Sequence, residues 1–231
     1  MQTINDVNIQ RHGVKTYDFL KVRSILEAKS VFIALKRVFD VLVSLFLIVF
    51  LSPFFLLIAL LIKIDTPGSV FFMHRRAGFQ GAEFLMLKFR TMKEGTEFIF
   101  RNEDKAKIER YGYHPKPKND PRITKVGRIL RRTSLDELPQ LFNVLLGDMS
   151  IVGPRPVMDY MRKPYMSIQI LREQVKPGIT GLWQICDREN GFVITSMVKY
   201  DLEYMEKMSF KEDFRILMRT IPAVISGRGA H

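Results

Sequence analysis

Cysteine is nearly absent from this chain of 231 residues, which holds a single one, and its four histidines are scattered without the spacing of metal ligands. One cysteine excludes an intramolecular disulfide framework, and the histidine pattern argues against a zinc or copper site. The glycine patterns of phosphate-binding and dinucleotide-binding loops are also missing. Any metal is therefore expected to be hard and oxygen-bound, such as Mg²⁺, and any nucleotide must be bound by another device.

Acidic residues are outnumbered as well, because 36 Lys and Arg stand against 24 Asp and Glu, for a formal net charge of +12. The partners of such a chain should be anionic, for example anionic membrane lipids or a phosphorylated substrate. The sequence has neither an aromatic ribonucleoprotein stretch nor paired zinc ligands, so we do not expect nucleic acid among these partners.

A long apolar run is present from residue 41 to 62, with Ser52 and Pro53 near its middle. As a straight helix it would measure about 33 Å, against a hydrocarbon core of about 30 Å. Proline removes a backbone hydrogen bond and a neighbouring serine hydroxyl can satisfy the freed carbonyl, so this pair predicts a bend. Lys and Arg flank both ends, so neither end looks translocated. A re-entrant helix and a kinked transmembrane anchor both remain open on these features.

The rest of the chain predicts an α+β fold with mostly helices. We expect an N-terminal extension over 1–35, the bent membrane helix over 36–65 and one cytoplasmic domain over 66–231. GFQG between two strand-like segments predicts a small β-hairpin, and 175–184 is expected to be a loop. Helices are expected near 196–208 and 210–226, the last of which could either lie in a membrane interface or cover the core.

A pair of carboxylates, Asp136 and Glu137, lies in the segment TSLDELPQ. With Ser134 as N-cap, the segment matches a helix capping box. Pro139 disfavours that register, because its missing N–H would be needed, whereas no donor is needed there if Asp136 is the N-cap. A carboxylate at that helix mouth is expected to stay ionised and can act as a nucleophile or metal ligand. Spacing alone leaves the cap and the reactive site both open.

Several cations stand where a phosphate would need them. Lys88 and Arg90 alternate on a predicted strand and should share a face. Arg122 lies in DPRITK, and Arg155 lies between two prolines in GPRP, a stiff loop that suits a fixed fork for phosphate. Each alone could form a surface salt bridge, but their joint presence in a basic, membrane-attached chain favours phosphate binding.

Four segments together resemble a known family, the bacterial sugar transferases, which are monotopic polyprenyl-phosphate phosphoglycosyl transferases that initiate exopolysaccharide and related glycan assembly. The segments are the apolar run with its flanks (KRVFD to SVFF), LKFRTM, the stretch from DPRITK through TSLDELPQ to GPRP, and VKPGITGLWQ. The resemblance covers residue 36 to the C-terminus. It implies a re-entrant helix bent at Ser52 and Pro53, in the bacterial inner membrane, with the catalytic domain on the cytoplasmic face.

The resemblance also implies a reaction, in which a sugar 1-phosphate moves from a UDP-sugar to undecaprenyl phosphate through a covalent intermediate, with release of UMP. Asp136 matches the nucleophile, and Glu137 matches the carboxylate that binds Mg²⁺ beside it, so both carboxylates are expected at the metal. Arg155 is implied in binding the nucleotide sugar. Three further cations match family positions near the site, and we expect them to bind substrate by their charge: Lys88, Arg90 and Arg122.

Two questions stay open at this level. A catalytically silent membrane scaffold of the polysaccharide assembly machinery is the alternative function, although intact Asp136, Glu137 and Arg155 argue against it. The residues do not name the sugar, and they leave open the oligomeric state, for which a homodimer through the catalytic domain is one arrangement.

Overall fold

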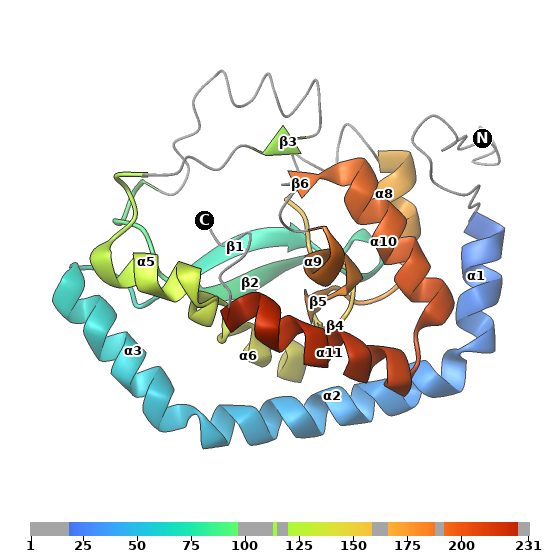
Figure 1. Cartoon of the computed structure of the whole chain (residues 1–231), viewed down its shortest axis with the longest axis horizontal. Coiled ribbons are helices and arrows are strands. Elements are labelled where there is room, and N and C mark those ends of the chain that lie inside the picture. The colour runs from blue at the N-terminus through green and yellow to red at the C-terminus, as the bar shows by residue number, and fades with distance from the viewer. Residues whose placement is uncertain (1–18, 97–112, 115–119, 159–165, 188–191, 226–231) are drawn as a thin grey trace.

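The computed structural model describes residues 19–96, 113–114, 120–158, 166–187 and 192–225. Helices form most of this part of the chain, and the strands pair in three two-stranded sheets, which confirms the α+β class. Two long helices, α2 (Ser30–Phe50) and α3 (Ser52–Asp65), run along one side of the molecule, and the other elements lie in the hollow of their bend (Figure 1).

The bend between α2 and α3 measures 61°. Ser52 donates a hydrogen bond from its hydroxyl to the carbonyl of Val49 at 2.8 Å. This is the carbonyl that the residue at position 53 would bind in a regular helix, and Pro53 has no N–H to do so. The expected role of the Ser-Pro pair at the bend is therefore confirmed.

Among the described residues no single helix has the length and apolarity of a membrane span, whereas α2 and α3 taken together do.

The two faces of the α2–α3 pair are the reverse of what a water-soluble helix shows. Polar side chains of α2 are buried against the rest of the protein, namely Lys36, Asp40 and Ser44. Many large apolar side chains of the pair are exposed, including Val31, Leu35, Val38, Leu42, Phe46, Val49, Phe50, Leu56, Leu57, Leu60 and Ile64. An apolar surface of this extent needs a cover other than water.

Helix α1 (Phe19–Ala28) precedes this pair and belongs to the packed core. Its Val22 is 1% exposed and lies in one cluster with Trp183 and Met197. Helix α2 begins at Ser30, ahead of the membrane helix start expected at 36. The expected boundary at 35 thus falls inside a helix, and the division into domains stays a prediction.

Strands β1 (Phe71–Ala77) and β2 (Glu83–Phe89) form the expected antiparallel hairpin around the short 3₁₀ helix η3 (Phe79–Gly81). The free edge of β2 is taken by a side chain, because the Asn143 amide accepts from the Leu87 N–H at 2.9 Å and donates to the Leu85 carbonyl at 2.8 Å. This pairing fixes β2 beside helix α6, on which Asn143 lies.

The middle of the chain forms a helix, a turn, a helix and a strand in that order. These elements are α5 (Lys125–Arg132), η4 (Leu135–Glu137), α6 (Gln140–Leu146) and β4 (Ser150–Val152). The loop expected over 175–184 is wrong, because this segment forms β5 (Gly178–Thr180), which pairs in parallel with β4, and begins α9 (Leu182–Cys186). A parallel pair needs a partner distant in sequence, which local patterns do not reveal.

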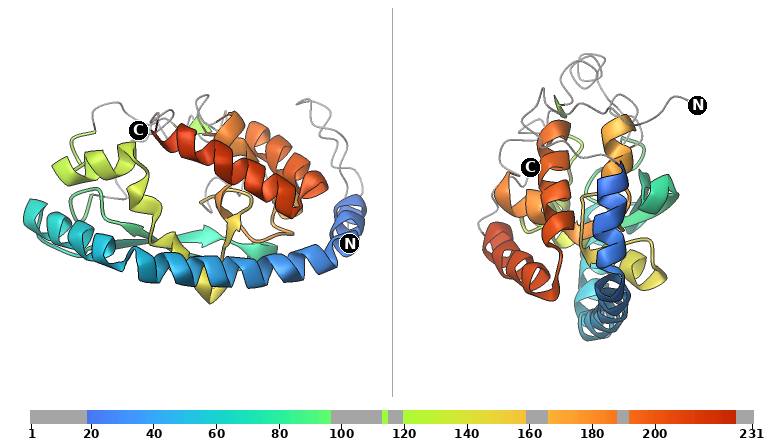
Figure 2. Two further views of the ribbon diagram at one scale, coloured as in Figure 1. Left: turned by 60° about the horizontal axis from the view of Figure 1, so that its bottom comes forward. Right: turned by 90° about the vertical axis from the view of Figure 1, so that its right-hand side faces the viewer.

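The C-terminal part is helical, with α8 (Met166–Arg172), α10 (Ile194–Lys207) and α11 (Phe210–Ile225). Two short strands, β3 (Tyr113–His114) and β6 (Phe192–Val193), pair beside them, and most of the polar stretch between residues 93 and 121 lies outside the described residues. The start of α11 lies near the first half of α2, and Figure 2 shows α11 running away from α2 from there.

Helix α11 covers the core, as one of the two readings of its pattern expects, and its place in a membrane interface stays a prediction. Its Asp213 and Ile216 are buried against the core, so one face covers the domain. The other face exposes four large apolar residues, which are Phe210, Phe214, Met218 and Ile221. This second face continues the exposed apolar surface of α2, since the rings of Phe210 and Phe32 lie 5.1 Å apart.

Candidate active site

Asp136 and Glu137 lie in the turn η4, between α5 and α6. Ser134 opens this turn in the left-handed conformation, with φ of 55°, and its side chain makes no capping hydrogen bond to the turn, so the capping-box interpretation is wrong. Pro139 directly precedes the first residue of α6, where its missing N–H costs nothing. The register with Asp136 as N-cap is therefore wrong too, because Pro139 is the N-cap of α6 and the carboxylates lie in a separate 3₁₀ turn just before it.

Cations from two other elements converge on the carboxylates. Lys88 of β2 places its Nζ 2.6 Å from a Glu137 oxygen and 3.9 Å from Asp136. Arg155, in the loop after β4, places Nη2 3.1 Å from the same Glu137 oxygen. The structure thus brings together four of the expected site residues, and Glu137 lies between the two cations.

Burial acts on Asp136, which is only 9% exposed. It raises the pKa of Asp136, Glu137 raises it further, and the charges of Lys88, Arg131 and Arg155 work in the opposite direction. A helix end alone would hold this pKa low, so the direction differs from the expectation. Burial and the adjacent carboxylate outweigh the turn and the cations.

Arg131 is a neighbour of the site that the sequence reasoning did not single out. It lies in the last turn of α5, and its Nε donates to the Thr91 hydroxyl at 2.8 Å. Its charge opposes the rise in the pKa of Asp136, and burial lowers the pKa of Arg131 itself. The sequence could have indicated Arg131 through its position five residues before Asp136, in the basic segment that leads into the carboxylates.

Two expected cations take part in other contacts. Arg90 lies just past the end of β2 and donates to the carbonyls of Pro67 at 2.5 Å and Thr66 at 2.8 Å, which follow α3. Arg122 pairs with Asp120 at 2.5 Å and thereby lowers the pKa of that carboxyl. The face that Lys88 and Arg90 were expected to share is thus not formed at the carboxylates, and the substrate roles of Arg90 and Arg122 stay predictions.

The carboxylate turn rests directly on the long helix pair. Leu135 and Leu138, on either side of the carboxylates, pack against a buried cluster that includes Ile58 and Ile62 of α3. The Asp65 carboxylate at the end of α3 accepts from the Val126 N–H at the start of α5, at 2.9 Å. The charged site is therefore held a few side chains away from the exposed apolar surface.

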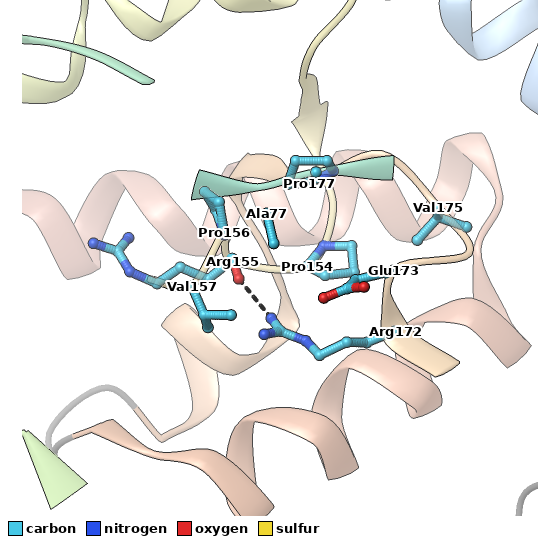
Figure 3. Close-up of a pocket in the computed structure, with 10 residues that line it drawn as sticks. Ala77, Pro154, Arg155, Pro156, Val157, Arg172, Glu173, Val175 and Pro177 are labelled. Carbon is cyan, nitrogen blue, oxygen red and sulfur yellow. Dashed lines mark hydrogen bonds between the residues drawn. The ribbon is translucent and has the colours of Figure 1, made fainter. Parts of the chain in front are cut away.

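The Gly-Pro-Arg-Pro loop that carries Arg155 is anchored by main-chain contacts. Gly153 donates to the Thr180 carbonyl at 2.9 Å, and Gly178 donates to the Pro154 carbonyl at 2.8 Å. Figure 3 shows a pocket along this loop, lined also by Arg172 and Glu173. The Arg155 side chain runs away from that pocket, so its guanidinium is presented to the carboxylate turn on the other side.

The donor set suits one kind of metal. In the part of the chain that the structure describes, no three His, Cys, Asp or Glu side chains gather as ligands. Asp136 and Glu137 are adjacent hard oxygen donors, and Mg²⁺ is commonly held by one or two carboxylates together with phosphate oxygens of a substrate. The residues therefore fit a Mg²⁺ ion that arrives with, or is completed by, a phosphorylated ligand.

Two adjacent carboxylates, of which Asp136 is buried, lie among cations, an arrangement that suits an enzyme acting on phosphorylated substrates. The family model of the bacterial sugar transferases matches residues 31–227, and the chain belongs to this family.

Three relatives illustrate the range of the family. The exopolysaccharide production protein ExoY of Rhizobium meliloti is 45% identical over 200 residues, which cover 85% of this chain and 88% of that protein. The undecaprenyl-phosphate galactose phosphotransferase of Salmonella typhimurium is 40% identical over 202 residues, covering 85% of this chain and 42% of the relative. A UDP-glucose:undecaprenyl-phosphate glucose-1-phosphate transferase of Caulobacter vibrioides is 38% identical over 204 residues, covering 85% of this chain and 72% of the relative.

Proposed function

We propose that this protein transfers a sugar 1-phosphate from a UDP-sugar to undecaprenyl phosphate and releases UMP, as the first membrane step of exopolysaccharide or related glycan assembly. The observation that carries the proposal is the Asp136–Glu137 pair, with Lys88 and Arg155 at hydrogen-bonding distance from Glu137 and α3 directly beneath. The names of the Salmonella and Caulobacter relatives support undecaprenyl phosphate as acceptor, and they favour UDP-galactose or UDP-glucose as donor.

The chemistry proceeds in two displacements at one phosphorus atom. A carboxylate oxygen of Asp136 attacks the phosphorus that bears the sugar, and the bond from that phosphorus to the bridging oxygen breaks, so UMP leaves with the electron pair. A phosphate oxygen of undecaprenyl phosphate then attacks the same phosphorus and displaces Asp136, which is regenerated as a carboxylate. Lys88, Arg131 and Arg155 offset the negative charge that would otherwise repel the nucleophile.

Mg²⁺ is the cofactor that we propose, held by Glu137 and Asp136. When bound, it would supply further charge neutralisation on the diphosphate. Lys88 and Arg155 hold Glu137 in place from two sides, and this leaves the adjacent Asp136 as the nucleophile.

The membrane arrangement is part of the proposal. We infer that α2 and α3 form a re-entrant helix that enters and leaves the inner membrane on its cytoplasmic face, where UDP-sugars are available. Two observations support it: the exposed apolar faces of α2, α3 and α11, and the attachment of α2 and α3 to the same domain at their outer ends, through Lys29 just before α2 and Asp65 at the end of α3. The net charge of +12 suits anionic lipids at that surface.

Intact-protein mass spectrometry tests the nucleophile. The wild type and Asp136→Asn are incubated with Mg²⁺ and UDP-glucose, UDP-galactose or UDP-N-acetylglucosamine, without a lipid acceptor. We expect a phosphosugar adduct on the wild type only, and UMP release when undecaprenyl phosphate is added. Glu203→Gln, which removes an exposed carboxylate on α10, is the control and should form the adduct normally.

The remaining outcomes separate the alternatives. UMP release without any adduct would mean direct transfer between the two substrates, which removes the covalent step and keeps the reaction. An adduct on Asp136→Asn would move the nucleophile to another residue. Absence of both adduct and UMP from the wild type with every donor would favour the membrane scaffold.

A further inference from the structure

Arg155 is held from behind by a second arginine. Arg172, the last residue of α8, donates from Nη2 to the main-chain carbonyl of Arg155 at 2.6 Å, as Figure 3 shows. The guanidinium of Arg155 points the other way, to Glu137 at 3.1 Å. One residue is therefore fixed at its carbonyl on the pocket side and faces the carboxylates with its side chain.

The second arginine is itself fixed by a buried acid. The Arg172 Nη2 lies 2.5 Å from Asp201 of α10, and the two side chains are 3% and 2% exposed. The Nη1 of Arg172 donates to the buried Gln169 side chain at 3.1 Å. A series of contacts therefore links Asp201 of α10 to Arg172 of α8, then to Arg155 and finally to Glu137. Neither Arg172 nor Asp201 forms an ion pair with Asp136 or Glu137.

Such a pair is a poor device for stability alone. A buried ion pair contributes about as much as well-packed apolar residues of the same volume, or less, because both charges lose their hydration. In this protein the Arg172–Asp201 pair contributes a directed hydrogen bond from Arg172 to the main-chain carbonyl of Arg155. Main-chain hydrogen bonds anchor the loop at Gly153 and Pro154, and because Pro156 has no N–H group, the bond from Arg172 holds the loop at Arg155 itself.

We propose that Arg172 and Asp201 are a positioning pair for Arg155, and that through Arg155 they set the affinity of the site for the diphosphate of the nucleotide-sugar donor. This inference rests on the proposed function, since it assumes that Arg155 binds the donor. A guanidinium fork that is displaced by a fraction of an ångström loses the geometry of two parallel hydrogen bonds to phosphate.

Binding of UDP in the presence of Mg²⁺, measured by titration calorimetry on the full chain in detergent, tests the pair without requiring turnover. We expect Asp201→Asn and Arg172→Lys each to raise the dissociation constant of UDP about tenfold or more. Arg155→Ala should raise it as well. In the Arg155→Ala background, Asp201→Asn and Arg172→Lys should then change the dissociation constant less than twofold, because the residue through which they act is gone.

A second buried pair provides the matched control. Lys36 and Asp213 are joined at 2.5 Å in a comparably buried setting, on elements that do not hold the Arg155 carbonyl. Any effect of Asp213→Asn on UDP binding should be the same factor with Arg155 or with Ala at position 155. This control separates a loss of general stability from a loss of positioning.

The proposal is overturned if Asp201→Asn and Arg172→Lys raise the dissociation constant by the same factor in both backgrounds, or leave it unchanged in the wild type. Should Asp201→Asn not fold, Arg172→Lys carries the test, since lysine keeps the charge beside Asp201 and loses the fork. A wild type that binds UDP but releases no UMP with any donor and acceptor would refute the proposed reaction. The double-mutant cycle with Arg155→Ala would in that case still test whether Arg172 and Asp201 position Arg155. A wild type that does not bind UDP would refute both.

Discussion

Glu137 has the densest set of contacts in the candidate site, with Lys88 and Arg155 on the same carboxylate oxygen. Two cations on one oxygen leave little freedom for rotation of the Glu137 side chain, and Lys88 also lies 3.9 Å from Asp136. The three cations around two carboxylates also leave a net positive charge, which favours a diphosphate over a neutral ligand. At the level of single residues, the charge of the site thus suits an anionic ligand.

Asp201 makes a prediction about the pH dependence of stability. Burial raises its pKa to about 6 from an ordinary value of 3.8, with the charge of Arg172 working against the rise. Between these two values the folded protein binds more protons than the unfolded chain, so the contribution of Asp201 to stability falls as the pH rises from about 4 to about 6. The fall is at most about 3 kcal/mol, and most of it has occurred by pH 6, where the folded-state carboxyl is half ionised.

Asp201→Asn should remove this slope. The measurement is the unfolding temperature of the wild type and the variant from pH 4 to 8 in the same detergent. We expect the wild type to lose stability relative to the variant between pH 4 and 6, and the difference to be constant above that. A difference that does not change across the range would mean that Asp201 titrates normally.

At the level of elements, close backbone packing holds the Arg155 loop. A Cβ added at Gly178 of β5 would lie 2.1 Å from the Gly153 nitrogen, and one added at Gly181 would lie 2.2 Å from the Gly153 oxygen. Neither contact can be relieved by rotating a side chain. The parallel pair of β4 and β5 therefore depends on glycine at these positions, and the loop after β4 inherits its place from that pair.

Gly178→Ala should push β4 and β5 apart. We expect a loss of stability of about 1–3 kcal/mol, or more if the backbone cannot shift, together with weaker donor binding because Arg155 moves with the loop. Thermal unfolding and UMP release from the same preparations are the measurements. Gly95→Ala is the comparison: Gly95 has a φ of 79°, so alanine should cost about 1 kcal/mol of backbone strain, but its Cβ meets no atom within 4 Å, so donor binding should not change. Equal behaviour of the two variants would contradict the packing argument.

The elements that could be predicted from the sequence are those with a local signal. The hairpin follows from alternating residues around Gly78 and Gly81, and the bend follows from Ser52 and Pro53. β5 could not be predicted, because its partner β4 lies about 25 residues away in the chain. The contacts of Arg90 could not be predicted for a similar reason, since its carbonyl partners follow α3 and only the fold brings them to the end of β2.

A buried charge network joins α2 to the domain. Lys36 lies 2.5 Å from Asp213 of α11 and 3.8 Å from Asp40, and Asp40 accepts from the Ser150 hydroxyl at 2.7 Å. Burial raises the pKa of Asp213, and Lys36 opposes that rise. Lys36 is thus the cation of two buried carboxylates and links α2 with α11.

Lys36→Met should destabilise the protein by about 3–5 kcal/mol, because two carboxylates are left buried without their cation. The double variant Lys36→Met, Asp213→Asn should be less destabilised than Lys36→Met alone, because Asp213→Asn removes one of the two buried carboxylates that have lost their cation. Lys63→Met, at the exposed end of α3, should change stability by less than about 0.5 kcal/mol. These values come from thermal unfolding in detergent. If the double variant is less stable than Lys36→Met, the charge argument is wrong.

At the level of the whole molecule, the bent pair is fastened to the domain at both of its outer ends. Arg37, near the start of α2, donates to the Val144 and Leu145 carbonyls at the end of α6, at 2.5 and 3.0 Å. Asp65, at the end of α3, accepts from Val126. A domain that holds both ends cannot have one of them on each side of a membrane.

This geometry predicts the topology in cells. Single cysteines are placed at Lys29, before α2, at Lys63, near the end of α3, and at Ser52 in the bend, each in a Cys186→Ser background because Cys186 is exposed. In intact spheroplasts a membrane-impermeant maleimide should label none of them. After the membrane is opened, the positions at 29 and 63 should react, and position 52 should stay protected because the bend lies in lipid. Labelling of position 29 in intact spheroplasts, with position 63 accessible only after opening, would establish a transmembrane anchor and refute the re-entrant arrangement.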